Sequence, residues 1–307
     1  MTISLKNRVA VVTGAGGGLG RAHALMLASR GAKVVVNDLG GALDGRGSSS
    51  AAADQVVAEI QASGGTAIPN YNSIAEEDGA NALIDAAVAA FGRIDILVNN
   101  AGFLRDKTFA KADLADFRAV VDVHLFGAVY CTQRALGHMR QQKYGRIVMT
   151  SSGAGLYGNF GQTSYGAAKL ALVGLMNVLK LEVQRDNILV NAVAPIAATR
   201  MTEGGMPATA LSHLTPEAVA AAVTYLASEE CTATGHVISA GAGYFARAAV
   251  MEGAGVFLDG ADAENPDAVA ANYDRIADLS GATAFSSAPD YIGRALARFG
   301  AETAEAH

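Results

Sequence analysis

The sequence predicts an α/β protein with one doubly wound parallel sheet of about seven strands, helices on both faces and a C-terminal extension. Short runs rich in Val and Ile alternate with longer Ala- and Leu-rich segments along residues 8–240. The short runs are continuously apolar, which is typical of strands whose two sheet faces are both covered by helices. A chain of 307 residues that is 51% hydrophobic has enough apolar material for a large core.

Each predicted helix lies between two predicted strands, so repeated βαβ units are expected. We expect strands at 8–14, 32–38, 65–71, 94–102, 145–152, 187–195 and 235–240. We expect helices at 19–30, 51–62, 79–91, 113–141, 164–185 and 216–228.

Two segments exceed this repeat. A Gly- and Ser-rich insertion at 39–54 follows the second strand, and we expect an ordered but mobile loop there. The tail at 241–307 keeps aromatic residues and apolar spacing. It is therefore expected to contain strands and a helix and to pack onto the domain formed by residues 1–240.

Composition excludes several classes of function. A net charge of −6 argues against nucleic-acid binding, and no apolar run approaches the roughly 20 residues that span a bilayer. The N-terminus lacks the pattern of a signal peptide, so an intracellular, cytoplasmic protein is expected. Cys131 and Cys231 have no CxxC spacing, and the six histidines show no metal-ligand spacing, so no metal site is predicted. Small molecules are the expected partners.

A glycine-rich turn follows the first predicted strand. "VVTGAGGGLGRA" places Gly14, Gly18 and Gly20 between that strand and the next helix. Glycines in this context allow a pyrophosphate to approach the backbone at a helix N-terminus. The pattern predicts a Rossmann-like dinucleotide site, although glycine turns also arise for packing alone.

Asp38 ends the second predicted strand, 24 residues after Gly14. A carboxylate there can accept hydrogen bonds from both hydroxyls of the adenosine ribose and would repel a 2′-phosphate. NAD is therefore favoured over NADP. Arg46, in the insertion, is the one nearby cation that could reverse this preference, and an ordinary turn residue is the alternative interpretation of Asp38.

The stretch "TSYGAAK" places Tyr165 four residues before Lys169, on one face of a predicted helix. If this stretch is taken alone, a purely structural interpretation suffices: the tyrosine caps a core helix, and the lysine beside it is solvated. However, Lys169 and a positive nicotinamide would both favour the phenolate and lower the pKa of Tyr165, making it a base for a substrate hydroxyl. Ser152, thirteen residues upstream, could hold the same substrate oxygen, and the neighbouring Ser151 could compete with it.

With these motifs and Asn-Asn-Ala-Gly at 99–102, the chain resembles the short-chain dehydrogenase/reductase family. The resemblance implies an NAD-dependent oxidoreductase in which Ser152, Tyr165 and Lys169 act on a secondary hydroxyl. It implies cofactor contacts from Gly14, Gly18, Leu19, Gly20, Asp38, Asn72, Ser73, Asn100, Ala101, Gly102, Tyr165, Lys169, Pro195 and Thr199. By the same resemblance, a homodimer or homotetramer is expected.

Three positions depart from the family pattern. Asn72 replaces an Asp, and Ile196 follows Pro195 where a Gly is usual, which brings Thr199 one residue early. His124 stands where many relatives carry an asparagine that links the lysine to a water chain. A proton-relay role for His124 is open, as is that of a core histidine.

Within the family, "VVVNDLGG", "YGNFGQ" and the tail resemble the (3R)-hydroxyacyl-CoA dehydrogenase unit of peroxisomal multifunctional type 2 enzymes. The resemblance implies oxidation of a fatty or sterol-derived (3R)-3-hydroxyacyl-CoA. Arg105, Lys107 and Lys111 could meet coenzyme A phosphates, or form a solvated basic loop. A hydroxysteroid or other secondary-alcohol dehydrogenase, and a non-catalytic NAD-binding regulator, are the alternatives.

Overall fold

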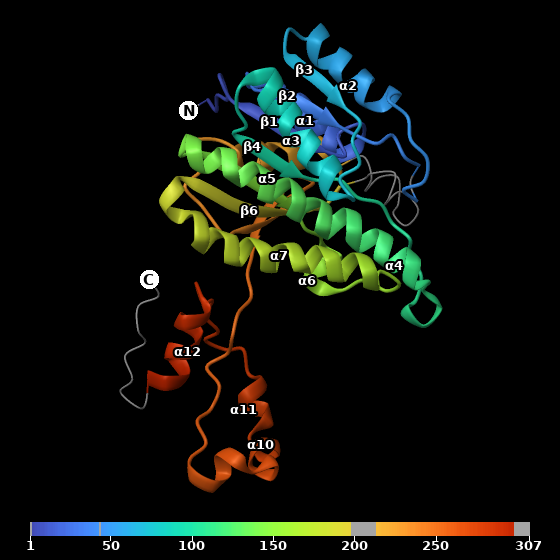
Figure 1. Cartoon of the computed structure of the whole chain (residues 1–307). Helices are drawn as coiled ribbons and strands as arrows, with labels where there is room; N and C mark the ends of the chain where they lie inside the picture. Colours follow the sequence, from blue (N-terminus) through green and yellow to red (C-terminus); the bar gives the residue numbers. More distant parts are fainter. Residues whose placement is uncertain (1, 43, 198–212, 298–307) are drawn as a thin grey trace. The chain divides into compact units, whose positions relative to one another are not determined.

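Eight strands form one sheet in the part of the chain that the structure describes, with the order β3-β2-β1-β4-β5-β6-β7-β8. The structure is a computed structural model, which describes residues 2–42, 44–197 and 213–297 (Figure 1). The strands are β1 Val9–Thr13, β2 Lys33–Asn37, β3 Thr66–Asn70, β4 Ile96–Asn99, β5 Gly145–Thr150, β6 Ile188–Pro195, β7 Val237–Gly241 and β8 Tyr244–Ala248.

The first seven strands pair in parallel, which confirms the predicted sheet. Two residues separate β7 from β8, and so short a connection joins antiparallel strands. All residues of β1, β4 and β5 are buried, because helices cover both faces of the sheet.

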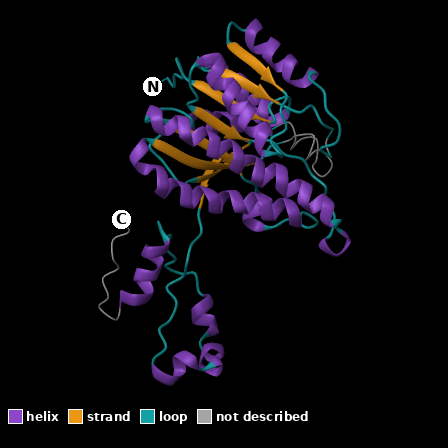
Figure 2. Ribbon diagram, in the orientation of Figure 1, coloured by secondary structure: helices purple, strands orange, loops and turns teal. Residues whose placement is uncertain are grey.

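The helices form two layers, one on each face of the sheet (Figure 2). On one face α1 contacts α2 and α9; on the other α3 contacts α5, and α7 packs against β5 and β6. The helices and helical turns of the first unit are α1 Gly18–Ser29, α2 Ala51–Ala62, α3 Glu77–Phe91, η1 Phe109–Lys111, α4 Leu114–Val121, η2 Asp122–Phe126, α5 Gly127–Gln142, α6 Gly153–Tyr157, α7 Thr163–Val183, η3 Gln184–Asp186 and α9 Pro216–Leu226.

The helix predicted at 113–141 is interrupted. A five-residue π-helical turn, η2, lies between α4 and α5 and contains His124. Turns of this kind add a residue to the helix and are frequent at functional sites. The 3.6-residue pattern of the sequence does not reveal the interruption, because both flanking helices keep their apolar face.

The strand order reverses between β1 and β4, since β1 pairs with β2 on one side and β4 on the other. The connections to the next helices diverge at this point and leave a crevice at the carboxyl ends of the strands. Ligands of doubly wound proteins bind in such crevices.

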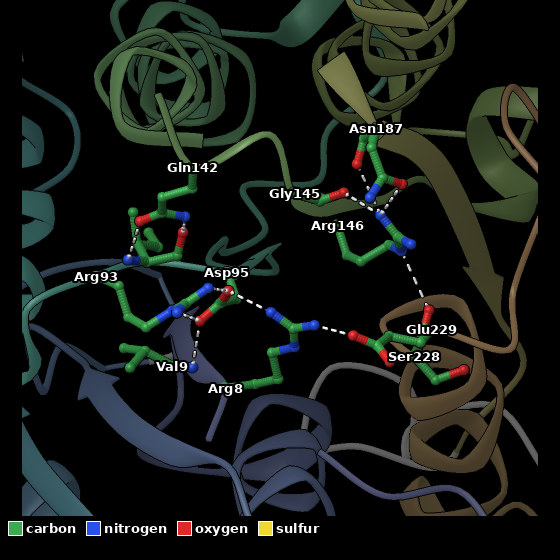
Figure 3. Close-up of polar contacts among 11 residues, drawn as sticks. Arg8, Val9, Arg93, Asp95, Gln142, Gly145, Arg146, Asn187, Ser228 and Glu229 are labelled. Atoms are coloured by element: carbon green, nitrogen blue, oxygen red, sulfur yellow. Dashed lines mark hydrogen bonds and ion pairs between the residues drawn. The ribbon is translucent and has the colours of Figure 1, made fainter. Parts of the chain in front are cut away.

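A polar network ties the amino ends of the strands together (Figure 3). The buried Asp95 carboxylate accepts hydrogen bonds from Arg8, from Arg93 and from the Val9 amide, so neither of its oxygens is left without a donor. Arg146, also buried, donates to the carbonyls of Asn187 and Ser228. These bonds hold the strands together at their amino ends, on the side of the sheet opposite the crevice.

The chain divides into two compact units, Met1–Arg247 and Ala248–His307. The second unit contains η5 Gly260–Glu264, α10 Pro266–Ala271, α11 Tyr273–Ala277 and α12 Ala288–Leu296. Backbone hydrogen bonds between Glu252 and Thr283 close it. One helix is expected in the tail; the stretch "DAVAANYDRIADL" at 267–279 instead falls on two short helices, α10 and α11. That this segment packs onto residues 1–240 stays a prediction.

Candidate active site

One cleft lies at the carboxyl ends of the strands and brings the predicted cofactor residues together. It is lined by Gly14, Gly18, Leu19, Gly20, Asp38, Asn72, Ser73, Asn100, Ala101, Gly102, Tyr165, Lys169 and Pro195, and also by His124. Thr199 is the one predicted cofactor residue outside the described residues. Sequence reasoning missed Asn37, Phe103 and Thr150, which also line the cleft and which all lie at or just after strand ends.

The glycine turn between β1 and α1 is tightly packed. Gly14 has a φ of +63°, and a Cβ there would lie 2.6 Å from the Ala101 Cα. A Cβ on Gly20 would lie 2.1 Å from the Gly14 carbonyl oxygen. Side chains at either position would push α1 away from the strands, so both glycines are required by close approach.

The N-terminus of α1 opens into the cleft, and no acidic residue belongs to its first turn. Its N-cap, Gly17, has no side chain that could accept a hydrogen bond from the first amide groups of the helix. The free amide groups and the positive end of the helix dipole therefore suit a phosphate group. The donor set fits the pyrophosphate of a dinucleotide.

Asp38 lies at the same end of the cleft. One carboxylate oxygen accepts from the Gly16 amide at 2.7 Å and the other from the Gly40 amide at 2.6 Å. These bonds hold the carboxylate in place and leave each oxygen further lone pairs. Arg46 is 75% exposed and pairs with Asp44 at 3.6 Å. Among the described residues lining the cleft, the basic side chains are Lys169 and His124.

The side chain of Asn100 braces the glycine turn. Its Nδ2 donates to the carbonyls of Thr13 and Gly14. The backbone amides of Asn100 and Ala101 both donate to the Thr13 hydroxyl. Thr13, at the end of β1, was not singled out from the sequence. The two strands on either side of the switch point are thereby held together at the floor of the cleft.

At the other end of the cleft, α7 carries Tyr165 and Lys169 one turn apart, as predicted. Ser152 caps α6, accepting from the Ala154 amide at 3.1 Å, and hydrogen-bonds Tyr165. The hydroxyl of Ser151 is buried and donates to the Lys169 carbonyl at 2.9 Å. Ser151 is therefore committed to holding the helix, whereas Ser152 contacts the tyrosine.

Burial raises the pKa of Tyr165, and so does the charge of Asp106, while the hydrogen bond to Ser152 opposes the rise. The direction differs from the lowered pKa expected from the sequence. The reason is the burial of the phenol itself, which disfavours its charged form. Burial acts on Lys169 as well and lowers the pKa of its ammonium to about 7. Its Nζ donates to the Thr150 carbonyl at 2.6 Å, and the Thr150 hydroxyl has no hydrogen-bond partner.

His124 is buried and faces the cleft. Its Nε2 lies 3.0 Å from the Phe103 amide nitrogen and 2.8 Å from the Phe103 carbonyl oxygen, so either neutral tautomer has a partner there. Its Nδ1 has none. Burial, together with the charge of Lys169, lowers the pKa of His124 to about 3. The imidazole is therefore neutral at physiological pH.

Comparison with known proteins decides the family. A family described as short chain dehydrogenase matches residues 8–207. The chain belongs to the short-chain dehydrogenase/reductase family. It is an oxidoreductase of that family, whose members use a nicotinamide dinucleotide and act on small molecules.

Relatives of three kinds match the chain in this family. A short-chain type dehydrogenase/reductase of Mycobacterium tuberculosis is 52% identical over 91% of this chain and 96% of its own length. Peroxisomal multifunctional enzyme A of Dictyostelium discoideum is 45% identical over 99% of this chain and 68% of its own length. A 3-oxoacyl-[acyl-carrier-protein] reductase of Synechocystis is 41% identical over 75% of this chain.

Two solved structures of the family are also similar. Full-length peroxisomal multifunctional enzyme type 2 of Drosophila melanogaster has a TM-score of 0.81 and 38% identity, and the match covers 97% of this chain but 50% of that one. A 7α-hydroxysteroid dehydrogenase complexed with NADH and 7-oxoglycochenodeoxycholic acid has a TM-score of 0.71 and 30% identity over 78% of this chain.

Two predicted absences concern metals and membranes. Within residues 2–42, 44–197 and 213–297, no cluster of His, Cys, Asp and Glu side chains has the arrangement of a metal site. No helix in those ranges combines the length and hydropathy that a bilayer span requires.

Proposed function

We propose that this enzyme oxidises the hydroxyl of a (3R)-3-hydroxyacyl-CoA to the 3-oxo group, with NAD⁺ as the hydride acceptor. The observation that carries the proposal is the shared cleft: Tyr165 and Lys169 line one end, and the glycine turn and Asp38 line the other. The acyl-CoA substrate is supported by the similarity to peroxisomal multifunctional enzymes.

The preference for NAD rests on Asp38. Its carboxylate is held by two backbone amides beside the N-terminus of α1 and would accept hydrogen bonds from the ribose hydroxyls. A 2′-phosphate would meet this negative charge, and the basic residue expected from the sequence as its counterion, Arg46, pairs with Asp44 instead. Glycine amides of the turn and α1 would hold the pyrophosphate.

Residues of the chain orient the substrate hydroxyl and accept its proton. Ser152 donates its hydroxyl hydrogen to the substrate oxygen and so holds it beside Tyr165. The phenolate of Tyr165 then accepts the hydroxyl proton as the carbinol carbon becomes a carbonyl. Bound NAD⁺ supplies the acceptor for the hydride that leaves this carbon. Lys169, held by Thr150, adds positive charge next to the phenolate when it is protonated.

His124 contributes as a neutral group. Because burial lowers its pKa to about 3, it does not carry a proton as imidazolium at neutral pH. Its unpartnered Nδ1 can donate or accept one hydrogen bond in the cleft, according to the tautomer. A relay through His124 therefore proceeds by exchange of tautomers.

The test is NAD⁺ reduction, followed in the near ultraviolet, with a panel of substrates. We expect turnover of (3R)-3-hydroxyacyl-CoA esters, little with the (3S) epimers, and a strong preference for NAD⁺ over NADP⁺. Turnover of free hydroxysteroids but of no acyl-CoA would favour the second candidate, a hydroxysteroid dehydrogenase, which the similarity to the 7α-hydroxysteroid enzyme supports. Activity only as an NADPH-dependent 3-oxoacyl reductase would overturn the proposal.

The cytoplasmic location and a homodimer or homotetramer built through helices α4, α5 and α7 remain predictions. Light scattering of the purified protein tests the second of these.

A further inference from the structure

Arg105 lies in the segment after β4, where the sequence suggested a partner for coenzyme A phosphates. In the structure, the Arg105 side chain is instead bonded to Asp44 and Asp116. Its Nε donates to the Asp44 carbonyl at 2.9 Å, and its Nη1 contacts the Asp116 carboxylate at 3.0 Å. The side chains of Arg105 and Asp116 are only 18% and 23% exposed. A charged hydrogen bond in this setting is stronger than one on an open surface.

The partner of Arg105, Asp44, belongs to the insertion between β2 and α2. Described residues of the insertion are folded: the Ser49 amide donates to the Leu39 carbonyl at its neck, and the Ala42 amide donates to the Arg46 carbonyl nearer its tip. Gly40 adopts a φ of +73°, and a Cβ there would lie 1.8 Å from the Ser49 carbonyl oxygen. The described residues of the insertion thus form a loop that is closed at its neck.

The tip of this loop meets the segment that carries Arg105. A Cβ on Gly45 would lie 2.5 Å from the Phe103 ring, so the loop backbone rests directly against that ring. The Arg105 guanidinium lies 4.9 Å from the centroid of the same ring. Phe103 therefore contacts both the loop and the guanidinium, and the guanidinium lies over the ring as cations do on aromatic faces.

The loop forms a wall of the cleft, whereas Arg105 does not line it. Leu39, Gly41, Ala42 and Gly45 line the cleft next to Asp38, the residue that would hold the adenosine ribose. Any effect of Arg105 on a bound dinucleotide must then pass through the position of these residues or of Phe103, which also lines the cleft.

We infer that Arg105 is a positioning residue for the dinucleotide: it holds the described loop residues of the insertion, 39–42 and 44–49, against Phe103, so that they enclose the adenosine end of the cofactor. The inference rests on the proposed function, because it takes the dinucleotide to bind with its adenosine end at Asp38. The ion pair with Asp116 fixes the guanidinium, and the bond to the Asp44 carbonyl transmits this position to the loop. Release of the cofactor requires the loop to move, so the contact slows release.

The variants Arg105→Gln and Arg105→Lys test this contact. Gln removes the charge and both bonds; Lys keeps an ion pair with Asp116 but cannot bridge to the Asp44 carbonyl at the same time. Arg118→Gln is the matched control, since Arg118 is 77% exposed and pairs with Asp122, the first residue of η2. Stopped-flow fluorescence gives the NADH dissociation rate. We expect it to rise about tenfold or more in Arg105→Gln, less in Arg105→Lys, and not in Arg118→Gln.

Two further measurements separate this role from a general loss of structure and from contact with substrate. Trypsin should cleave after the exposed Arg46 faster in the Arg105 variants, and NADH should protect the wild type more than the variants. The kcat and the KM for acyl-CoA, measured at saturating NAD⁺, should stay within about twofold of wild type.

Each outcome has a distinct meaning. An unchanged NADH dissociation rate in both Arg105 variants overturns the inference. A KM for acyl-CoA that rises tenfold with unchanged NADH release also overturns it, in favour of coenzyme A contact. Wild-type protein that binds neither NADH nor NADPH refutes the proposed function instead, and preference for NADPH refutes only its cofactor, because the same variants can then be tested with NADPH.

Discussion

The rings of His124 and Tyr165 meet edge to face, with their centroids 5.2 Å apart and their planes at 89°. His124 sits in the π-helical turn η2, and Tyr165 sits on α7, so two helices meet at this contact. The contact requires a glycine at position 102, after β4, because the His124 ring occupies the space that a side chain there would fill. A Cβ on Gly102 would lie 1.9 Å from the His124 Cε1.

Gly102→Ala should therefore displace the His124 ring and disturb Tyr165. We expect a loss of about 1–3 kcal/mol in the free energy of unfolding from overpacking. The double variant Gly102→Ala/His124→Ala should recover part of this, because the clash needs both side chains. Urea denaturation of the two single variants and the double variant measures the coupling. Strictly additive losses would contradict the contact.

Tyr165→Phe should abolish proton transfer while leaving the cofactor site intact. We expect turnover to fall by about two to four orders of magnitude, since the phenol oxygen is the proton acceptor. NADH affinity, measured by fluorescence titration, should change little because the ring remains. Activity near the wild-type level would end the assignment of Tyr165 as the base.

Asp38→Asn should weaken the discrimination between NAD⁺ and NADP⁺. The amide keeps one acceptor oxygen but no charge to repel a 2′-phosphate, so the ratio of the two kcat/KM values should fall by about tenfold or more. Asp38→Ala should also weaken binding of both cofactors, because the Gly16 and Gly40 amides lose their acceptor. If the ratio is the same in the wild type and in Asp38→Asn, another residue selects the cofactor.

Asp106→Asn should shift the pH profile of oxidation toward lower pH. Asp106 accepts a hydrogen bond from Gln162, the residue just before α7, and its charge raises the pKa of Tyr165. Oxidation needs the phenolate, so kcat/KM rises with pH through this pKa; without the charge of Asp106 the pKa falls and the rise begins earlier. The isosteric Asn keeps an acceptor for Gln162. A profile identical to wild type would show that Asp106 does not act on Tyr165.

His23→Leu should make the protein more resistant to acid. His23 is fully buried in α1 with no partner for either ring nitrogen, and burial lowers its pKa to about 3. Between pH 3 and the unfolded-state pKa near 6.5, the unfolded chain binds one more proton here than the native state, so stability falls as pH falls. Leu removes that proton, so the pH slope of the unfolding free energy should decrease by about 1.4 kcal/mol per pH unit. Denaturant titrations at pH 4.5, 5.5 and 7 measure the slope, and unchanged slopes would mean that His23 titrates normally.

Local sequence determined much of this protein. Val-rich runs flanked by amphipathic segments can only be buried as strands between two helix layers, and the seven parallel strands follow the predicted ranges. The glycine turn before α1, Asp38 after β2, and Tyr165 and Lys169 one turn apart are short-range patterns, so they too could be predicted. All described members of the predicted cofactor set line one cleft.

Tertiary structure decided what depends on burial and on contacts distant in sequence. The helix interruption that holds His124, the low pKa values of His124 and Lys169, and the raised pKa of Tyr165 all arise from desolvation, which a linear pattern does not report. Arg105 shows the same limit. Its charge suggested a phosphate ligand, but only the folded chain brings Asp44 and Asp116 to it, and those contacts turn a candidate substrate residue into the support of the cofactor cleft.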